Sequence, residues 1–100
     1  MERIRLSPFE VEEIVKAAKE VFGKGVRVWL FGSRTDPTRK GGDIDLYIET
    51  PEGYELRKLT AFLARLYISL GERKIDVVLE KYGSSGEIAE EAKNKGVRLC

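Results

Sequence analysis

Three aspartates, Asp43, Asp45 and Asp76, carry the clearest indication of chemistry in this chain. Asp43 and Asp45 are two residues apart in a β-like run, so both carboxylates point to the same face of one strand. Asp76 lies in a second β-like run and joins the other two if the two strands are neighbours. Carboxylates of this kind bind Mg²⁺ against nucleotide phosphates. A third one can take the proton of an incoming hydroxyl.

A Gly-Ser turn directly follows the first apolar run. Gly32 allows the backbone to approach a phosphate closely, and the Ser33 hydroxyl and nearby backbone N–H groups can donate to it. Arg34, Arg39 and Lys40 lie in the same loop, and any of them could neutralise phosphate charge. For Arg39 and Lys40, a solvated turn is an equally good interpretation.

The alternative to a metal site is a strand with one solvated face, where aspartate is tolerated. For Asp76 alone this is the better interpretation, whereas Asp43 and Asp45 together in an apolar strand need a reason, because aspartate is a poor β-former. The spacing does not match a Walker A loop. A calcium loop is also excluded, because Tyr47 stands where a third oxygen ligand is required.

The apolar pattern predicts an α/β (α+β) fold, with a small mixed sheet of three to four strands flanked by helices. Ser7, Pro8 and Glu10 form the start of a first helix, with Gly23 at its end. Strands are expected at 26–31, 43–49 and 74–79, with a short edge strand at 97–99. The first two should be antiparallel, because their connection is too short for a crossover helix. The second and third should be joined by a right-handed crossover helix over 54–70.

The strand over 43–49 alternates, so Ile44, Leu46 and Ile48 are expected to face the core, with Asp43, Asp45 and Tyr47 facing away. Ser84 is expected to cap the last helix with Glu87 as its capping-box partner, and Gly96 to end it. The core stripe of the 54–70 helix is predicted to comprise Leu56, Leu59, Leu63, Leu66, Tyr67 and Leu70.

Four further apolar residues lie on the other side of the 54–70 helix: Tyr54, Ala61, Ala64 and Ile68. They are either scattered surface residues or a docking face for a helical partner or a second copy of the chain.

Length and composition limit the function classes. One hundred residues predict one domain over 1–100, with an open site that a partner or substrate helps to complete. The net charge of +1 argues against a nucleic-acid partner.

The absence of histidine excludes histidine acid–base catalysis, and Cys100 as the single cysteine fits a reducing compartment. With no apolar run long enough to span a membrane and no signal-peptide stretch, we expect a cytoplasmic protein.

The segments 30–34 (LFGSR) and 41–46 (GGDIDL), followed by Asp76, resemble the signature of the DNA polymerase beta-like nucleotidyltransferases. That signature is Gly-Ser, a short spacer, Asp-x-Asp on the next strand and a later third aspartate. The size and order of elements are similar to the minimal nucleotidyltransferases (the MNT group). The resemblance covers nearly the whole chain.

The resemblance implies a nucleotidyltransferase fold and a site in which Asp43, Asp45 and Asp76 are catalytic and bind two Mg²⁺ ions with the nucleotide. The nucleotide-binding residues would be Gly32, Ser33, Arg34 and Gly42. The reaction would transfer a nucleoside monophosphate, AMP from ATP, to a hydroxyl group and release pyrophosphate. Minimal members act as antitoxins of all-helical HEPN-domain toxins, some by adding AMP to a tyrosine of the toxin.

The chain departs from the pattern in one place. Many members have Ala-Arg-Gly soon after Gly-Ser-Arg, whereas Thr35, Asp36 and Pro37 follow here. The phosphate-binding cation is therefore open among Arg34, Arg39 and Lys40. Two other functions remain open: a non-catalytic antitoxin that occludes its partner, and nucleotide transfer to RNA or a small molecule.

Overall fold

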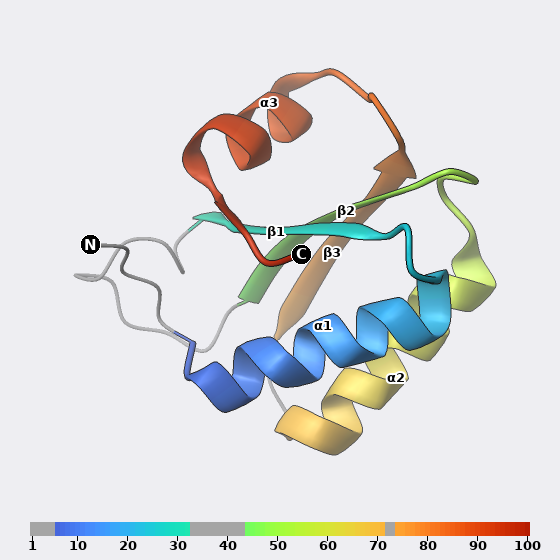
Figure 1. Ribbon diagram of the computed structural model, residues 1–100, viewed down its shortest axis with the longest axis vertical. Coiled ribbons are helices and arrows are strands. Elements are labelled where there is room, and N and C mark those ends of the chain that lie inside the picture. Colours follow the sequence, from blue (N-terminus) through green and yellow to red (C-terminus); the bar gives the residue numbers. More distant parts are fainter. Residues whose placement is uncertain (1–5, 33–43, 72–73) are drawn as a thin grey trace.

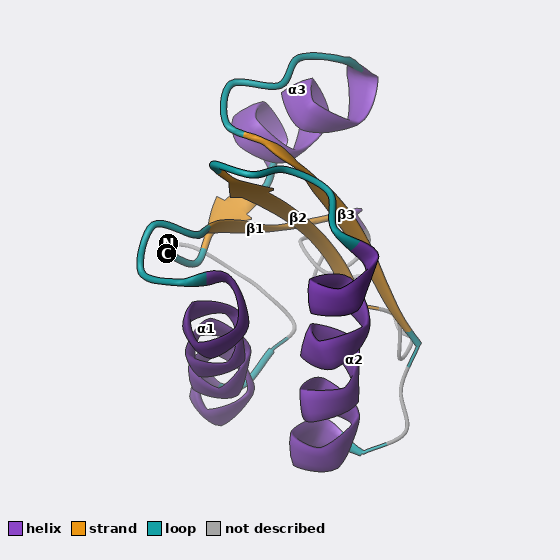
Figure 2. Ribbon diagram, turned by 90° about the vertical axis from the view of Figure 1, so that its right-hand side faces the viewer, coloured by secondary structure: helices purple, strands orange, loops and turns teal. Residues whose placement is uncertain are grey.

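The computed structural model describes residues 6–32, 44–71 and 74–100, in which a sheet is covered on both faces by helices (Figures 1 and 2). Helices α1 (Pro8–Phe22) and α2 (Leu56–Leu70) lie side by side under one face of the sheet, and α3 (Glu87–Lys95) lies over the other. The strands are β1 (Arg27–Phe31), β2 (Ile44–Thr50), β3 (Ile75–Lys81) and β4 (Val97–Arg98). This mixed α/β architecture confirms the predicted fold class.

The sheet has the strand order β3-β2-β1-β4. As predicted, β1 and β2 are antiparallel, and β2 and β3 are parallel with α2 as their connection. The short β4 pairs antiparallel with β1, which confirms the expected edge strand. This order places the starts of β2 and β3 next to the end of β1, so all three candidate site segments meet at one end of the sheet.

The predicted start of α1 is confirmed. The Ser7 hydroxyl accepts a hydrogen bond from the Glu10 backbone N–H, and the Glu10 carboxylate accepts one from the Ser7 N–H. Two N–H groups that the first turn of a helix leaves without a helical partner are thereby satisfied. Gly23 ends the helix.

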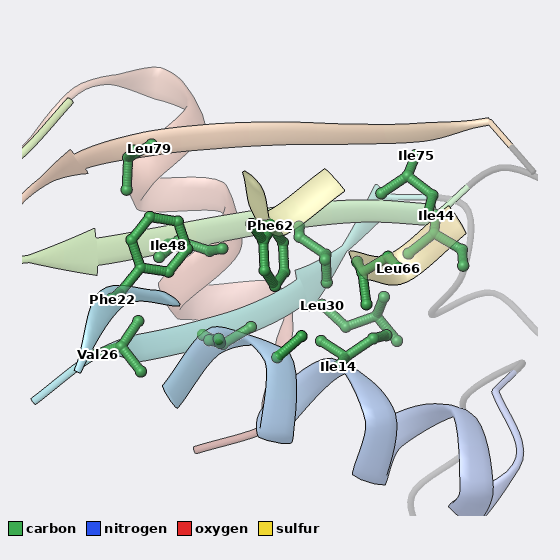
Figure 3. Packing of buried hydrophobic residues seen from close by; sticks show 14 of the residues in the cluster. Ile14, Phe22, Val26, Leu30, Ile44, Ile48, Phe62, Leu66, Ile75 and Leu79 are labelled. Carbon is green, nitrogen blue, oxygen red and sulfur yellow. The ribbon is translucent and has the colours of Figure 1, made fainter. Parts of the chain in front are cut away.

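The main core lies between the sheet and the α1–α2 pair (Figure 3). Alternate residues of β1 and β2, including Leu30, Ile44 and Ile48, point into it and are fully buried. Phe22 of α1 and Phe62 of α2 meet there with ring centroids 5.4 Å apart. Burying a large apolar side chain contributes about 2 kcal/mol, so these contacts fix both helices against the strands that carry the candidate site.

Two expectations for the helices are wrong. The apolar pattern places Leu56 and Tyr67 in the core stripe of α2, yet they are 59% and 45% exposed, and Phe62 is buried in their place. α2 lies under one side of the sheet with α1 on one flank only, so its buried arc is narrower than the apolar pattern indicated. The last helix starts at Glu87 with Gly86 as N-cap and no side-chain cap. The Ser84 hydroxyl instead donates to the Lys81 carbonyl, because it belongs to the preceding turn.

Candidate active site

Asp45 and Asp76 are direct partners in the parallel pairing of β2 and β3. Paired residues of adjacent strands project from the same face of a sheet, about 4.8 Å apart. Ile44 and Leu46, the neighbours of Asp45 in the chain, are fully buried in the main core, so the two carboxylates lie on the opposite face, the one that α3 partly covers. Asp45 is half-buried, whereas Asp76 is exposed at the edge strand. Two predicted site residues are thus brought together.

Gly32 lies against the carboxylate of Asp45. It follows Phe31, the β1 residue that pairs with Asp45. Its φ is +76°, and a Cβ added to it would lie 2.5 Å from Asp45 Oδ2. A side chain at this position would therefore collide with the carboxylate, and the backbone conformation is one that L-residues rarely adopt. The glycine keeps a backbone surface open directly beside Asp45.

The other predicted site residues lie outside the described part of the chain. They are Ser33, Arg34, Gly42 and Asp43, together with the alternative loop cations Arg39 and Lys40. Their assignments stay predictions. Within residues 6–32, 44–71 and 74–100, no group of three or more acidic or cysteine side chains lies close enough to hold a metal ion. The described part of the site therefore consists of Gly32, Asp45 and Asp76.

The chemistry of these donors fits Mg²⁺. Asp45 and Asp76 offer hard carboxylate oxygens on neighbouring strands, and the glycine beside Asp45 leaves room for a phosphate. Mg²⁺ is typically bound by one or two carboxylates with substrate phosphates and water completing its coordination. Asp45 and Asp76 would supply the one or two carboxylates, and substrate phosphates and water would supply the remaining ligands.

A second group of polar residues lies further along the same face, beneath α3. Glu49 is only 1% exposed, and its carboxylate accepts a hydrogen bond of 2.8 Å from the Tyr47 hydroxyl. Lys93 of α3 places its Nζ 2.5 Å from Glu49 Oε2, and Arg27 of β1 lies 3.9 Å from Oε1. This cluster of Tyr47, Glu49 and Lys93 is the polar link between α3 and the centre of the sheet.

Burial alone would raise the pKa of the Glu49 carboxyl, but the hydrogen bonds from Lys93 and Tyr47 and the Lys93 charge outweigh it and hold that pKa below its ordinary value. Burial and the nearby Glu49 carboxylate raise the pKa of the Tyr47 hydroxyl. Lys93 also lies over the rings of Trp29 and Tyr47, 5.8 and 5.9 Å from their centroids. Because its pKa is lowered, the Glu49 carboxylate is ionised at neutral pH, and its ion pair with Lys93 holds α3 against the sheet.

The sequence did not predict this cluster. Tyr47 was expected to face away from the core, and it does leave the main core, but it is fully buried in a second one with Trp29, Ala89 and Ala92. One sequence signal could have indicated it. Asp45, Tyr47 and Glu49 alternate along β2 and so share one face, and the last helix is amphipathic, so it could cover that face. A single strand does not show that both of its faces are covered.

A family model described as the nucleotidyltransferase domain matches residues 11–99. The match covers most of the chain, so the protein belongs to this family, within the DNA polymerase beta-like superfamily. It is accordingly a transferase domain whose chemistry is nucleotidyl transfer. The search of curated proteins found no match. No helix in the described residues is long and apolar enough to cross a membrane.

Proposed function

We propose that this chain is a metal-dependent nucleotidyltransferase that transfers AMP from ATP to a hydroxyl group of a partner protein. The observation that supports this most strongly is the pairing of Asp45 with Asp76 beside Gly32. The nucleotidyltransferase family match gives the reaction class. In this arrangement one carboxylate is half-buried next to a backbone suited to phosphate, and the other is exposed where an acceptor can reach it.

Each residue has a distinct part in the proposed reaction. Gly32, with Ser33 after it, binds the β- and γ-phosphates through backbone N–H groups. Asp45, together with Asp43, holds Mg²⁺, which when bound neutralises phosphate charge and orients the triphosphate. Asp76 accepts the proton of the acceptor hydroxyl. Catalysis is then mainly positioning and charge neutralisation.

A protein acceptor in a toxin–antitoxin pair is the finer part of the proposal. The net charge of only +1 argues against nucleic acid as the acceptor. Its α2 helix carries exposed apolar residues, with Ile68 85% exposed, where a helical partner such as a HEPN-domain toxin can dock. Together with the resemblance to the minimal nucleotidyltransferases, these features favour an antitoxin that modifies its partner in the cytoplasm.

The test is to co-express the chain with the protein encoded beside its gene, incubate the purified pair with ATP and Mg²⁺, and measure intact masses. We expect the partner to gain one or more AMP units. Asp45→Asn should abolish the gain, because it removes a metal ligand, while Glu52→Gln, an equivalent loss of charge at an exposed position after β2, should not. Retained transfer by Asp45→Asn would contradict the site assignment.

A specific observation also supports an occluding antitoxin, since the exposed face of α2 can bind a partner without chemistry. The two functions separate in one experiment. If Asp45→Asn still protects cells from the partner and no mass change occurs with the wild type, occlusion is the function. Transfer to RNA or a small molecule would show as ATP consumption without a protein adduct.

A further inference from the structure

β3 forms one edge of the sheet in the described part of the chain. The Lys74 carbonyl accepts from the Ile44 N–H, and the Tyr82 N–H donates to the Thr50 carbonyl, so the even-numbered residues of β3 direct their backbone groups toward β2. The odd-numbered residues Ile75, Val77 and Leu79 therefore direct their N–H and C=O groups away from β2. These backbone groups form a row that an added strand can pair with.

The candidate site residues follow one another across the sheet toward this edge. Gly32 comes at the end of β1, Asp45 lies on β2, and Asp76 lies directly beside it on β3. A strand added outside β3 would place one of its residues about 4.8 Å beyond Asp76 and on the same face. That residue would be the next neighbour of the carboxylate proposed to accept the acceptor proton.

The side of α2 below this edge is apolar. Arg65 forms an ion pair with Glu20 of α1, so its side of α2 faces α1. Tyr67 is two residues further, about 200° around the helix, and therefore lies on the opposite flank, toward β3. Leu56, eleven residues before Tyr67, has nearly the same angular position. Both side chains are exposed.

We propose that the acceptor is an extended polypeptide segment that pairs antiparallel with the free edge of β3 and places a hydroxyl residue opposite Asp76. This inference rests on the proposed function. The hydroxyl oxygen attacks the α-phosphorus of ATP, an O–P bond forms, and the bond to pyrophosphate breaks. Pyrophosphate leaves with the electron pair of that bond, and the hydroxyl proton passes to Asp76. Alternate side chains of the segment rest on Tyr67 and Leu56.

The side chains of β3 specify which segment fits. On the face of Asp76, the strand presents Val78 and Glu80, and Lys74, two residues before Asp76, directly precedes the strand. In antiparallel pairing, the residue four before the acceptor lies opposite Glu80, the residue two before it lies opposite Val78, and the residue two after it lies opposite Lys74. Opposite charges across a strand pair are favourable and like charges are not. The preferred segment is thus basic-x-apolar-x-hydroxyl-x-acidic.

Synthetic peptides test the proposal without altering the protein. A peptide Lys-x-Val-x-Tyr-x-Glu, with uncharged residues at x, should gain AMP from ATP and Mg²⁺ at least about tenfold faster than the charge-swapped Glu-x-Val-x-Tyr-x-Lys. N-methylation of a residue next to the tyrosine should abolish transfer, because its N–H points to β3. N-methylation of the tyrosine itself should be tolerated, because its N–H points outward. Equal rates for both peptides, or equal effects of both methyl positions, would overturn the proposal.

Val77→Pro removes an outward N–H while leaving the pairing with β2 intact, since proline is tolerated where the N–H faces away from the sheet. Val77→Ala removes the side chain and keeps the N–H. We expect transfer to the peptide to fall about tenfold or more further in Val77→Pro than in Val77→Ala, with ATP binding retained. Equal rates in the two variants would contradict strand addition, and so would a wild-type dimer that Val77→Pro converts to a monomer.

The two proposals fail differently. If the wild type releases no pyrophosphate with any acceptor, the proposed function fails and this inference falls with it. If the wild type transfers AMP to its co-expressed partner but never to the peptides, or does so independently of the β3 edge, only this inference is overturned.

Discussion

A Cβ placed on Gly32 would lie 2.5 Å from Oδ2 of Asp45. This relationship links the turn after β1 to the carboxylate of β2, and it gives the glycine a role beyond backbone freedom. We expect Gly32→Ala to reduce nucleotidyl transfer about a hundredfold or more, because a displacement of about 1 Å at reacting groups has effects of that size. Steady-state rates with ATP and Mg²⁺ measure the loss.

Gly83 provides the matched control for this substitution. Its φ is +77°, close to the +76° of Gly32, but a Cβ added to it would have nothing within 4 Å. Gly83→Ala should therefore carry the same backbone penalty, about 1–2 kcal/mol of unfolding free energy, and leave transfer near the wild-type rate. If both variants lose activity equally, strain alone explains the effect and the contact with Asp45 does not matter.

Mg²⁺ should stabilise the folded chain through Asp45, one of the proposed metal ligands. A ligand that binds only the folded state adds about 2.7 kcal/mol to the free energy of unfolding at a hundred times its Kd. We expect Mg²⁺ with a non-hydrolysable ATP analogue to raise the wild-type melting temperature by several degrees. In Asp45→Asn the rise should be lost.

The ion pair beneath α3 should matter for stability at neutral pH. Lys93→Met removes the nearer of two cations from the buried Glu49 carboxylate and leaves Arg27 at 3.9 Å; breaking one side of a buried pair costs about 3 kcal/mol. Urea unfolding at pH 7 measures this. Adding Glu49→Gln to Lys93→Met should recover part of the loss, since a neutral amide is less costly to bury. A double variant that is less stable than Lys93→Met would contradict this account.

The same pair predicts a pH dependence with a definite sign. The pKa of Glu49 is lowered from 4.5 in the folded protein. Its stabilising contribution is therefore fully present above about pH 4.5 and is lost as the pH falls through the lower folded value. The stability difference between wild type and Lys93→Met should accordingly shrink below pH 4.5. A constant difference between pH 7 and pH 3 would show that the charge of Glu49 is not involved.

Local sequence signals predicted much of the fold. The capping box of Ser7 and Glu10 is confirmed because both partners lie within one turn, and the short connection correctly implied antiparallel β1 and β2. The crossover helix correctly implied that β3 runs parallel to β2, whereas the register that pairs Asp45 with Asp76 comes from the structure. Those features depend on neighbours in the chain.

The errors concern contacts between distant segments. Nothing near Tyr47 or Glu49 in the chain indicates that α3 covers them, and Lys93 lies more than forty residues away. The predicted core face of α2 wrongly included Tyr67 and omitted Phe62. When a helix has apolar residues on more than one side, the elements that pack against it decide which side is buried. Ser84 is followed by Glu87 as in a capping box, but the Ser84 hydroxyl donates to the Lys81 carbonyl in the preceding turn and does not cap the helix.

The most direct test of the central claim is to follow label from ATP that carries it on either the α- or the γ-phosphate. We predict that α-label is transferred to the partner protein while γ-label leaves as pyrophosphate, and that Asp45→Asn and Asp76→Asn stop both events. Transfer of γ-label to the partner would mean phosphoryl transfer. Transfer of α-label that survives both substitutions would place the chemistry elsewhere, and either result would contradict the site built from Gly32, Asp45 and Asp76.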